Sequence, residues 1–115
     1  MENFLEYIDQ SVLALQQEEK ELIASDRKDE ANFVRIRSNV YGIAKAYYGA
    51  VQKAAPEEFK DEYTRRITKL LGTWQDACDK ATAHEDVEKT VVEEVKLQTL
   101  KEILQHFDEK GNSNL

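Results

Sequence analysis

Apolar residues recur at intervals of three and four along almost the whole chain, and no stretch alternates apolar with polar residues as a strand would. This pattern predicts four long helices, at residues 2–24, 27–54, 56–81 and from near residue 82 to 110. The only proline, Pro56, is expected to start the third helix, because proline suits the first helical position. The fold class is therefore all-α.

Capping residues mark the predicted helix ends. Asp26 is the expected N-cap of the second helix, and Thr82 with Glu85 three residues later forms a capping box that starts the fourth. Gly111 is the expected C-terminal cap, and residues 111–115 are expected to fray. Because the links are short and the helices long, consecutive helices should be antiparallel. Residues 1–110 are thus predicted to form a single domain, an antiparallel up-down-up-down four-helix bundle.

The charge distribution is more informative than the total. The chain has a formal net charge of −7, which disfavours nucleic acid as a partner, whereas residues 27–53 carry six bases and two acids. No stretch is long and apolar enough to span a membrane, and the N-terminus lacks the pattern of a signal peptide. With one cysteine, Cys78, no internal disulfide can form, so we expect a cytoplasmic protein with no membrane role.

Two charged residues fall within apolar helix faces. Arg37 lies in the apolar arc of the second helix, and Glu19 lies in that of the first. A hairpin that turns near residues 25–28 would bring them within about one turn of each other. We therefore predict a semi-buried ion pair between Glu19 and Arg37 that fixes the register of the hairpin, with anion binding by Arg37 as the alternative.

Two surfaces are candidates for protein contacts. Gly42, Ala46 and Gly49 line one face of the second helix, and glycines within a helix suggest that another chain approaches closely. In the fourth helix the apolar phase changes, so that Leu97 and Leu104 point away from the valines of its first half. Exposed leucines seven apart favour self-association, and together the two features predict a homodimer or a complex with another protein.

Catalytic chemistry has less support. The acids of residues 57–61 and 76–79 resemble the acidic pattern of all-α nucleotide pyrophosphohydrolases, whose carboxylates hold Mg²⁺. Both groups fall on one predicted helix, however, and Asp61 and Asp79 point away from its Trp74 face. Cys78 shares the Trp74 face as a small core residue. His84 falls in a turn, and His106 is expected on the surface.

The sequence therefore predicts a small acidic, non-catalytic helical bundle that acts through protein–protein contacts and needs no cofactor or metal. The alternatives are a metal-dependent nucleotide hydrolase and a bundle that binds a small ligand beside Tyr47, Tyr63 and Trp74. Inward convergence of Glu58 and Glu62 with acids of the fourth helix would favour the hydrolase.

Overall fold

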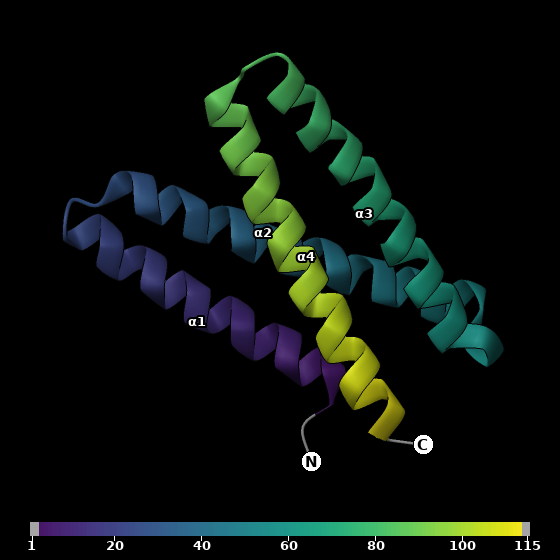
Figure 1. Cartoon of the computed structure of the whole chain (residues 1–115). Helices are drawn as coiled ribbons and strands as arrows, with labels where there is room; N and C mark the ends of the chain where they lie inside the picture. The colour runs from purple at the N-terminus through teal and green to yellow at the C-terminus, as the bar shows by residue number, and fades with distance from the viewer. Residues whose placement is uncertain (1–2, 114–115) are drawn as a thin grey trace.

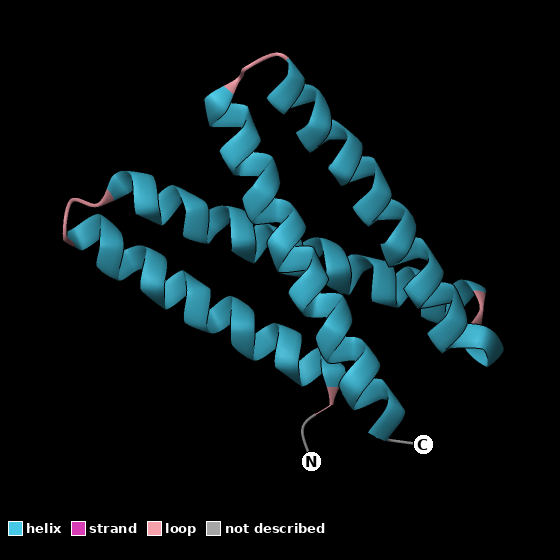
Figure 2. Cartoon of the chain, in the orientation of Figure 1, coloured by secondary structure: helices cyan, strands magenta, loops and turns pink. Residues whose placement is uncertain are grey.

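The computed structural model describes residues 3–113, with the side chains of residues 3–109. Four α-helices account for nearly all of it, α1 (Phe4–Ala24), α2 (Lys28–Ala54), α3 (Phe59–Ala83) and α4 (Val87–Ser113), with a 3₁₀ turn, η1 (Pro56–Glu58), before α3. The described residues contain no strand (Figure 2), so the all-α prediction is confirmed. Pro56 opens the 3₁₀ turn, and α3 itself begins three residues later.

The helices form two hairpins that cross. Within each hairpin the helices run antiparallel, α1 with α2 and α3 with α4, and the second hairpin lies obliquely across the first (Figure 1). Helix α2 packs against all three other helices, whereas α1 and α3 meet through side chains, the ring of Phe4 lying 5.8 Å from that of Tyr63. The arrangement therefore departs from the regular up-down-up-down bundle that the short links predict, since short links fix each hairpin but not the angle between hairpins.

An aromatic cluster joins the hairpins where their ends converge. Phe4 of α1 meets Phe107 of α4 with 5.0 Å between ring centroids, and Phe107 meets Tyr63 of α3 at 4.7 Å. Tyr48 of α2 packs on Phe59 at 4.6 Å. Tyr63 is fully buried, and its hydroxyl donates a hydrogen bond to the carbonyl oxygen of Ala44 at 2.9 Å. All four helices thus contribute to this end of the core.

Both predicted N-caps are wrong. Asp26 has φ 59° in the link between α1 and α2, and the N-cap of α2 is Arg27, which makes no capping hydrogen bond. Thr82 lies inside α3 and donates from its hydroxyl to the carbonyl of Cys78 at 2.9 Å, which is a common alternative for threonine. Asp86 instead caps α4, because its carboxylate accepts the backbone N–H of Lys89 at 3.2 Å.

Helix α4 also passes through Gly111 to Ser113, so this glycine does not end it. Residues 114 and 115 of the expected frayed tail lie outside the described residues.

Helix α4 has two apolar faces, and the face that is exposed is not the one that the sequence predicts. Leu97 is buried, and Leu104 packs against the core from a partly buried position. By contrast, the side chains of Val87 and Val91 are 72% and 37% exposed. Among residues 3–109 the predicted exposed leucine face is therefore not found, because Leu97 and Leu104 are turned toward the interior.

The predicted pair between Glu19 and Arg37 is replaced by two others. Glu19 lies 3.2 Å from Arg35, within the first hairpin, and Arg37 lies 3.7 Å from Glu102 of α4. Residues 35 and 37 are about 200° apart around a helix, so they meet different neighbours. Arg37 thus links the hairpins, beside the hydrogen bond of 2.9 Å between the hydroxyls of Tyr7 and Tyr41.

Candidate protein-interaction surface

A groove lies between the first turns of α2 and the first turns of α4, and we call it the α2–α4 groove. It has a volume of about 430 Å³ and is lined by Asp29, Asn32, Phe33, Val87, Glu88, Val91 and Val92. Four of these seven side chains are apolar, and Val87 is the most exposed large apolar residue among the described residues. Apolar side chains gathered in an exposed hollow are typical of sites that bind another protein.

The charge of this groove is acidic. Asp29 and Glu88 lie on opposite walls, and no basic residue lines it. The side chains of both acids are exposed. A partner that covers the valines would therefore meet a carboxylate on each side, which favours a basic rim around its apolar centre.

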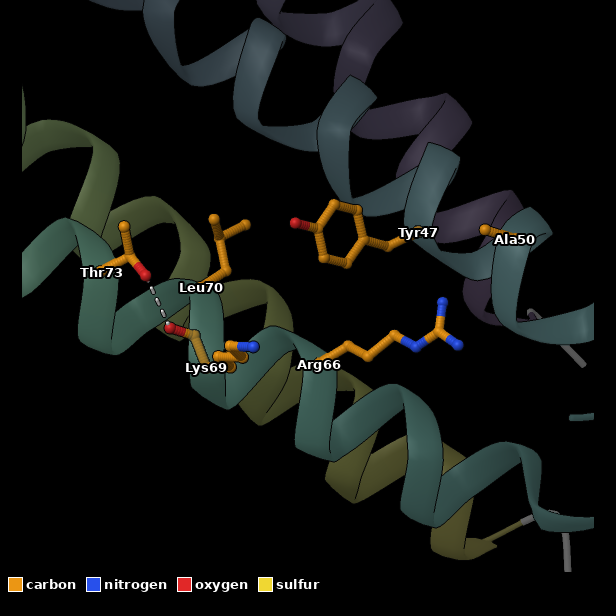
Figure 3. A pocket seen from close by; sticks show the side chains of 6 residues that line it. All are labelled: Tyr47, Ala50, Arg66, Lys69, Leu70 and Thr73. Carbon is orange, nitrogen blue, oxygen red and sulfur yellow. Dashed lines mark hydrogen bonds between the residues drawn. The ribbon is translucent and has the colours of Figure 1, made fainter. Parts of the chain in front are cut away.

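A second groove, the α2–α3 groove, separates the later turns of α2 from the middle of α3 (Figure 3). It has a volume of about 420 Å³ and is lined by Tyr47, Ala50, Arg66, Lys69, Leu70 and Thr73. The ring of Tyr47 projects from α2 into the groove, and the side chain of Arg66 extends from α3 below it. The lining contains two bases and no acid, opposite in sign to the first groove.

Glu62 holds Arg66 in place. Its carboxylate accepts a hydrogen bond from Nε of Arg66 at 2.7 Å and also pairs with Arg65. The Glu62 side chain is only 12% exposed, so the two guanidinium groups compensate for the burial of its charge. The carboxylate of Glu62 is therefore occupied by ion pairs with two arginines of its own helix.

The face of Gly42, Ala46 and Gly49 is exposed on α2. A Cβ atom added to Gly42 or Gly49 would have nothing within 4 Å, so no part of the chain requires a glycine at either position. The close approach that the sequence suggests is thus not made within the monomer.

Replacing Gly42 or Gly49 with alanine is expected to raise the free energy of unfolding by about 0.5–1 kcal/mol, because alanine loses less backbone entropy in a helix. Urea unfolding followed by circular dichroism measures the change. Gly72→Ala on α3 is the matched control, since its added Cβ also has open space and should give the same gain. A loss of stability at residues 42 and 49 alone would contradict this expectation.

The acids behind the hydrolase alternative are spread apart. Glu58, Asp61, Asp76 and Asp79 are all exposed, and Glu62 is held by the two arginines. Among residues 3–109, no three histidine, cysteine, aspartate or glutamate side chains gather as a metal site requires. The convergence of α3 and α4 acids that would favour the hydrolase alternative is therefore not seen in the described part of the chain.

The three rings of the small-ligand alternative have three different surroundings. Tyr63 is in the core, Tyr47 lines the α2–α3 groove, and Trp74 is covered by Lys96 of α4, whose Nζ lies 4.6 Å from the ring centroid. They therefore share no cavity. Within α4, Lys96 also lies 3.4 Å from the buried carboxylate of Glu93, so one lysine pairs with Glu93 and contacts Trp74 of α3.

The remaining candidates have structural roles. Cys78 is buried, as expected of a small core residue. His84 is exposed in the link before α4. His106, expected on the surface, instead stacks on Tyr7 of α1 with 3.5 Å between ring centroids. The stacking adds a further contact between the hairpins.

Sequence reasoning missed both grooves. The phase change in α4 was the available signal for the first, but periodicity shows that two faces exist and not which one is covered. For the second, no comparable signal exists, because its two bases, Arg66 and Lys69, fall in a predicted helix that also carries acids.

The described residues thus form an all-helical unit with open grooves between its helices. A family model described as Cse1 matches residues 1–115, the whole chain. The chain therefore belongs to the Cse1 family, whose members generally mediate protein–protein interactions. No curated protein and no solved structure matches it. Within the described residues, no helix has the length and apolar character needed to cross a membrane.

Proposed function

We propose that this protein is a non-catalytic cytoplasmic interaction module that binds a partner protein in its α2–α4 groove. The observation that carries the proposal is the exposure of Val87 and Val91 beside Phe33, in a hollow between two helices. Large apolar side chains kept in water contribute nothing to the stability of the chain itself. Burial against a partner would recover that free energy.

The shape of the groove favours a helical partner. Val87 and Val91 are four residues apart on one face of α4, and α2 supplies the opposite wall with Phe33. An amphipathic helix can place residues at the same spacing into such a hollow. The carboxylates of Asp29 and Glu88 would then pair with basic residues at the edges of the partner's apolar face.

The test is a double substitution, Val87→Asp with Val91→Asp. Both side chains are exposed, so we expect stability to stay within about 0.5 kcal/mol, while partner affinity falls at least about tenfold because two carboxylates replace the apolar contact. A photo-crosslinking residue at position 91 identifies the partner, and calorimetry then compares its affinity for the wild-type and substituted chains.

Leu13→Asp is the matched control, because Leu13 is 66% exposed on α1 and lies outside the groove. Crosslinking from position 13 should not capture the same protein. Equal loss of affinity in the control, or unchanged affinity in the double variant, would contradict binding in this groove.

Self-association is the second candidate, supported by the open space above Gly42 and Gly49. In this proposal the exposed face of Gly42, Ala46 and Gly49 packs against the same face of a second copy. Leu97 and Leu104 take no part, because both side chains face the interior.

Light scattering after size-exclusion chromatography, over a dilution series, tests the homodimer. We expect a dimer mass that falls toward the monomer on dilution, and a clear weakening in Gly49→Leu with unchanged helicity. The added side chain has room in the monomer, so lost association could not be attributed to misfolding. A monomer at every concentration would remove this candidate.

A further inference from the structure

We propose that the α2–α3 groove is a second, independent binding site, which takes a segment of an acidic peptide. The site is built from Tyr47 and Ala50 on α2 and from Arg66, Lys69 and Leu70 on α3 (Figure 3). It shares no lining residue with the α2–α4 groove. Its occupant is inferred from charge, uncommitted hydrogen-bond donors and the apolar part of the lining.

The groove has the opposite charge to the molecule as a whole. The chain carries 23 acids and 16 bases, yet Arg66 and Lys69 line this groove without an acid. The α2 wall contributes only the uncharged Tyr47 and Ala50, and Arg66 is paired with Glu62, so Lys69 supplies the uncompensated positive charge. A local positive field on an acidic protein attracts a negatively charged segment and repels most of the protein's own surface.

Several donors in the groove lack partners. Lys69 makes no ion pair with any side chain of residues 3–109, and the hydroxyl of Tyr47 makes no hydrogen bond there. Arg66 uses Nε for Glu62, and its Nη atoms make no hydrogen bond with residues 3–109. Guanidinium and ammonium groups bind carboxylates through charge-assisted hydrogen bonds, so these groups suit glutamate or aspartate side chains.

The apolar part of the lining favours a peptide over a bare ion. Leu70, Ala50 and the ring of Tyr47 face the same space as the cations. At about 420 Å³ the groove has the size of sites that hold several groups of a ligand. An acidic segment that also carries a leucine-like side chain would use both parts.

The experiment measures binding of a fluorescein-labelled peptide of glutamates and leucines by anisotropy, with the full chain at low salt. A twin peptide with glutamine in place of each glutamate is the ligand control. We expect the acidic peptide to bind, the twin to bind at least about tenfold more weakly, and added salt to weaken the acidic peptide's binding.

Lys69→Glu is expected to reduce affinity for the acidic peptide at least about tenfold. Lys80→Glu is the matched control, because it changes the net charge equally on the same helix, about 16 Å further along. Both lysines are exposed, so both variants should fold. Tyr47→Phe, which keeps the ring, should weaken binding by a smaller factor.

Three outcomes would overturn the proposal. The first is an equal effect of Lys69→Glu and Lys80→Glu, which would show attraction by net charge alone. The second is equal affinity for the glutamine twin, which would show apolar binding. The third is complete displacement by inorganic phosphate at concentrations near those of the peptide, which would indicate a simple anion site. The substitutions Val87→Asp and Val91→Asp should leave binding of the acidic peptide unchanged. The proposals for the two grooves can therefore be refuted independently.

Discussion

Replacing Phe107 with alanine is expected to lower the free energy of unfolding by about 3–5 kcal/mol. Phe107 is 4% exposed, and its ring lies 5.0 Å from that of Phe4 and 4.7 Å from that of Tyr63. The substitution leaves a cavity at the point where α1, α3 and α4 meet. Because the ring contacts both hairpins, the loss should weaken their association as well as the core.

Urea unfolding followed by circular dichroism measures this change. Leu13→Ala is the control for loss of an apolar side chain at the surface, and its effect should stay within about 0.5 kcal/mol, since Leu13 is 66% exposed. A loss below about 1 kcal/mol for Phe107→Ala would show that the aromatic cluster does not hold the hairpins together.

Alkaline pH is expected to destabilise the protein through two tyrosines. Burial raises the pKa of Tyr63 well above its ordinary value, and the neighbouring Tyr48 adds to the shift. Burial also raises the pKa of Tyr7, and the hydrogen bond with Tyr41 raises it further. In the unfolded chain both hydroxyls ionise near pH 10, whereas in the folded chain they keep their protons to higher pH.

The folded state therefore binds more protons than the unfolded state above about pH 10. Stability from these groups is fully present below that pH and falls as pH rises toward the folded pKa values, by up to about 1.4 kcal/mol per pH unit for each tyrosine. Urea unfolding at a series of alkaline pH values measures the slope, and tyrosinate absorbance follows ionisation in the folded chain.

Tyr63→Phe separates the contribution of Tyr63. It removes the hydroxyl that donates to the carbonyl of Ala44, so we expect a loss of about 0.5–1.5 kcal/mol at neutral pH. Above about pH 10 its stability should fall less steeply than that of the wild type. An identical slope in the two proteins would contradict the role of Tyr63.

For the proposed interaction surfaces, apolar periodicity predicts which residues share a helix face but not which face is buried. The sequence places Val87 and Val91 on one face of a helix and Leu97 with Leu104 on another, and the structure keeps both faces. Which face is buried depends on where α2 and α3 cross α4, and that crossing is set by side-chain packing between distant segments. The sequence therefore points to the leucine face as the partner surface, whereas the structure leaves the valine face available for one.

For the ion pairs, too, the sequence identifies the charged residues but not their partners. The sequence identifies Glu19 and Arg37 as charges on largely apolar faces, and both do form ion pairs with other helices. Because Arg35 and Arg37 lie about 200° apart around α2, the rotation of α2 about its own axis decides which of them meets Glu19. Periodicity alone does not fix that rotation.

The sequence by itself determined the four helices, their short links and the acidic balance of the chain, because helix propensity and apolar spacing are local properties. Only the tertiary structure decided the crossing of the hairpins and, with it, the two grooves of opposite charge. The physical reason is that a helix pattern specifies which residues share a face, whereas the neighbour of that face depends on packing among all four helices at once.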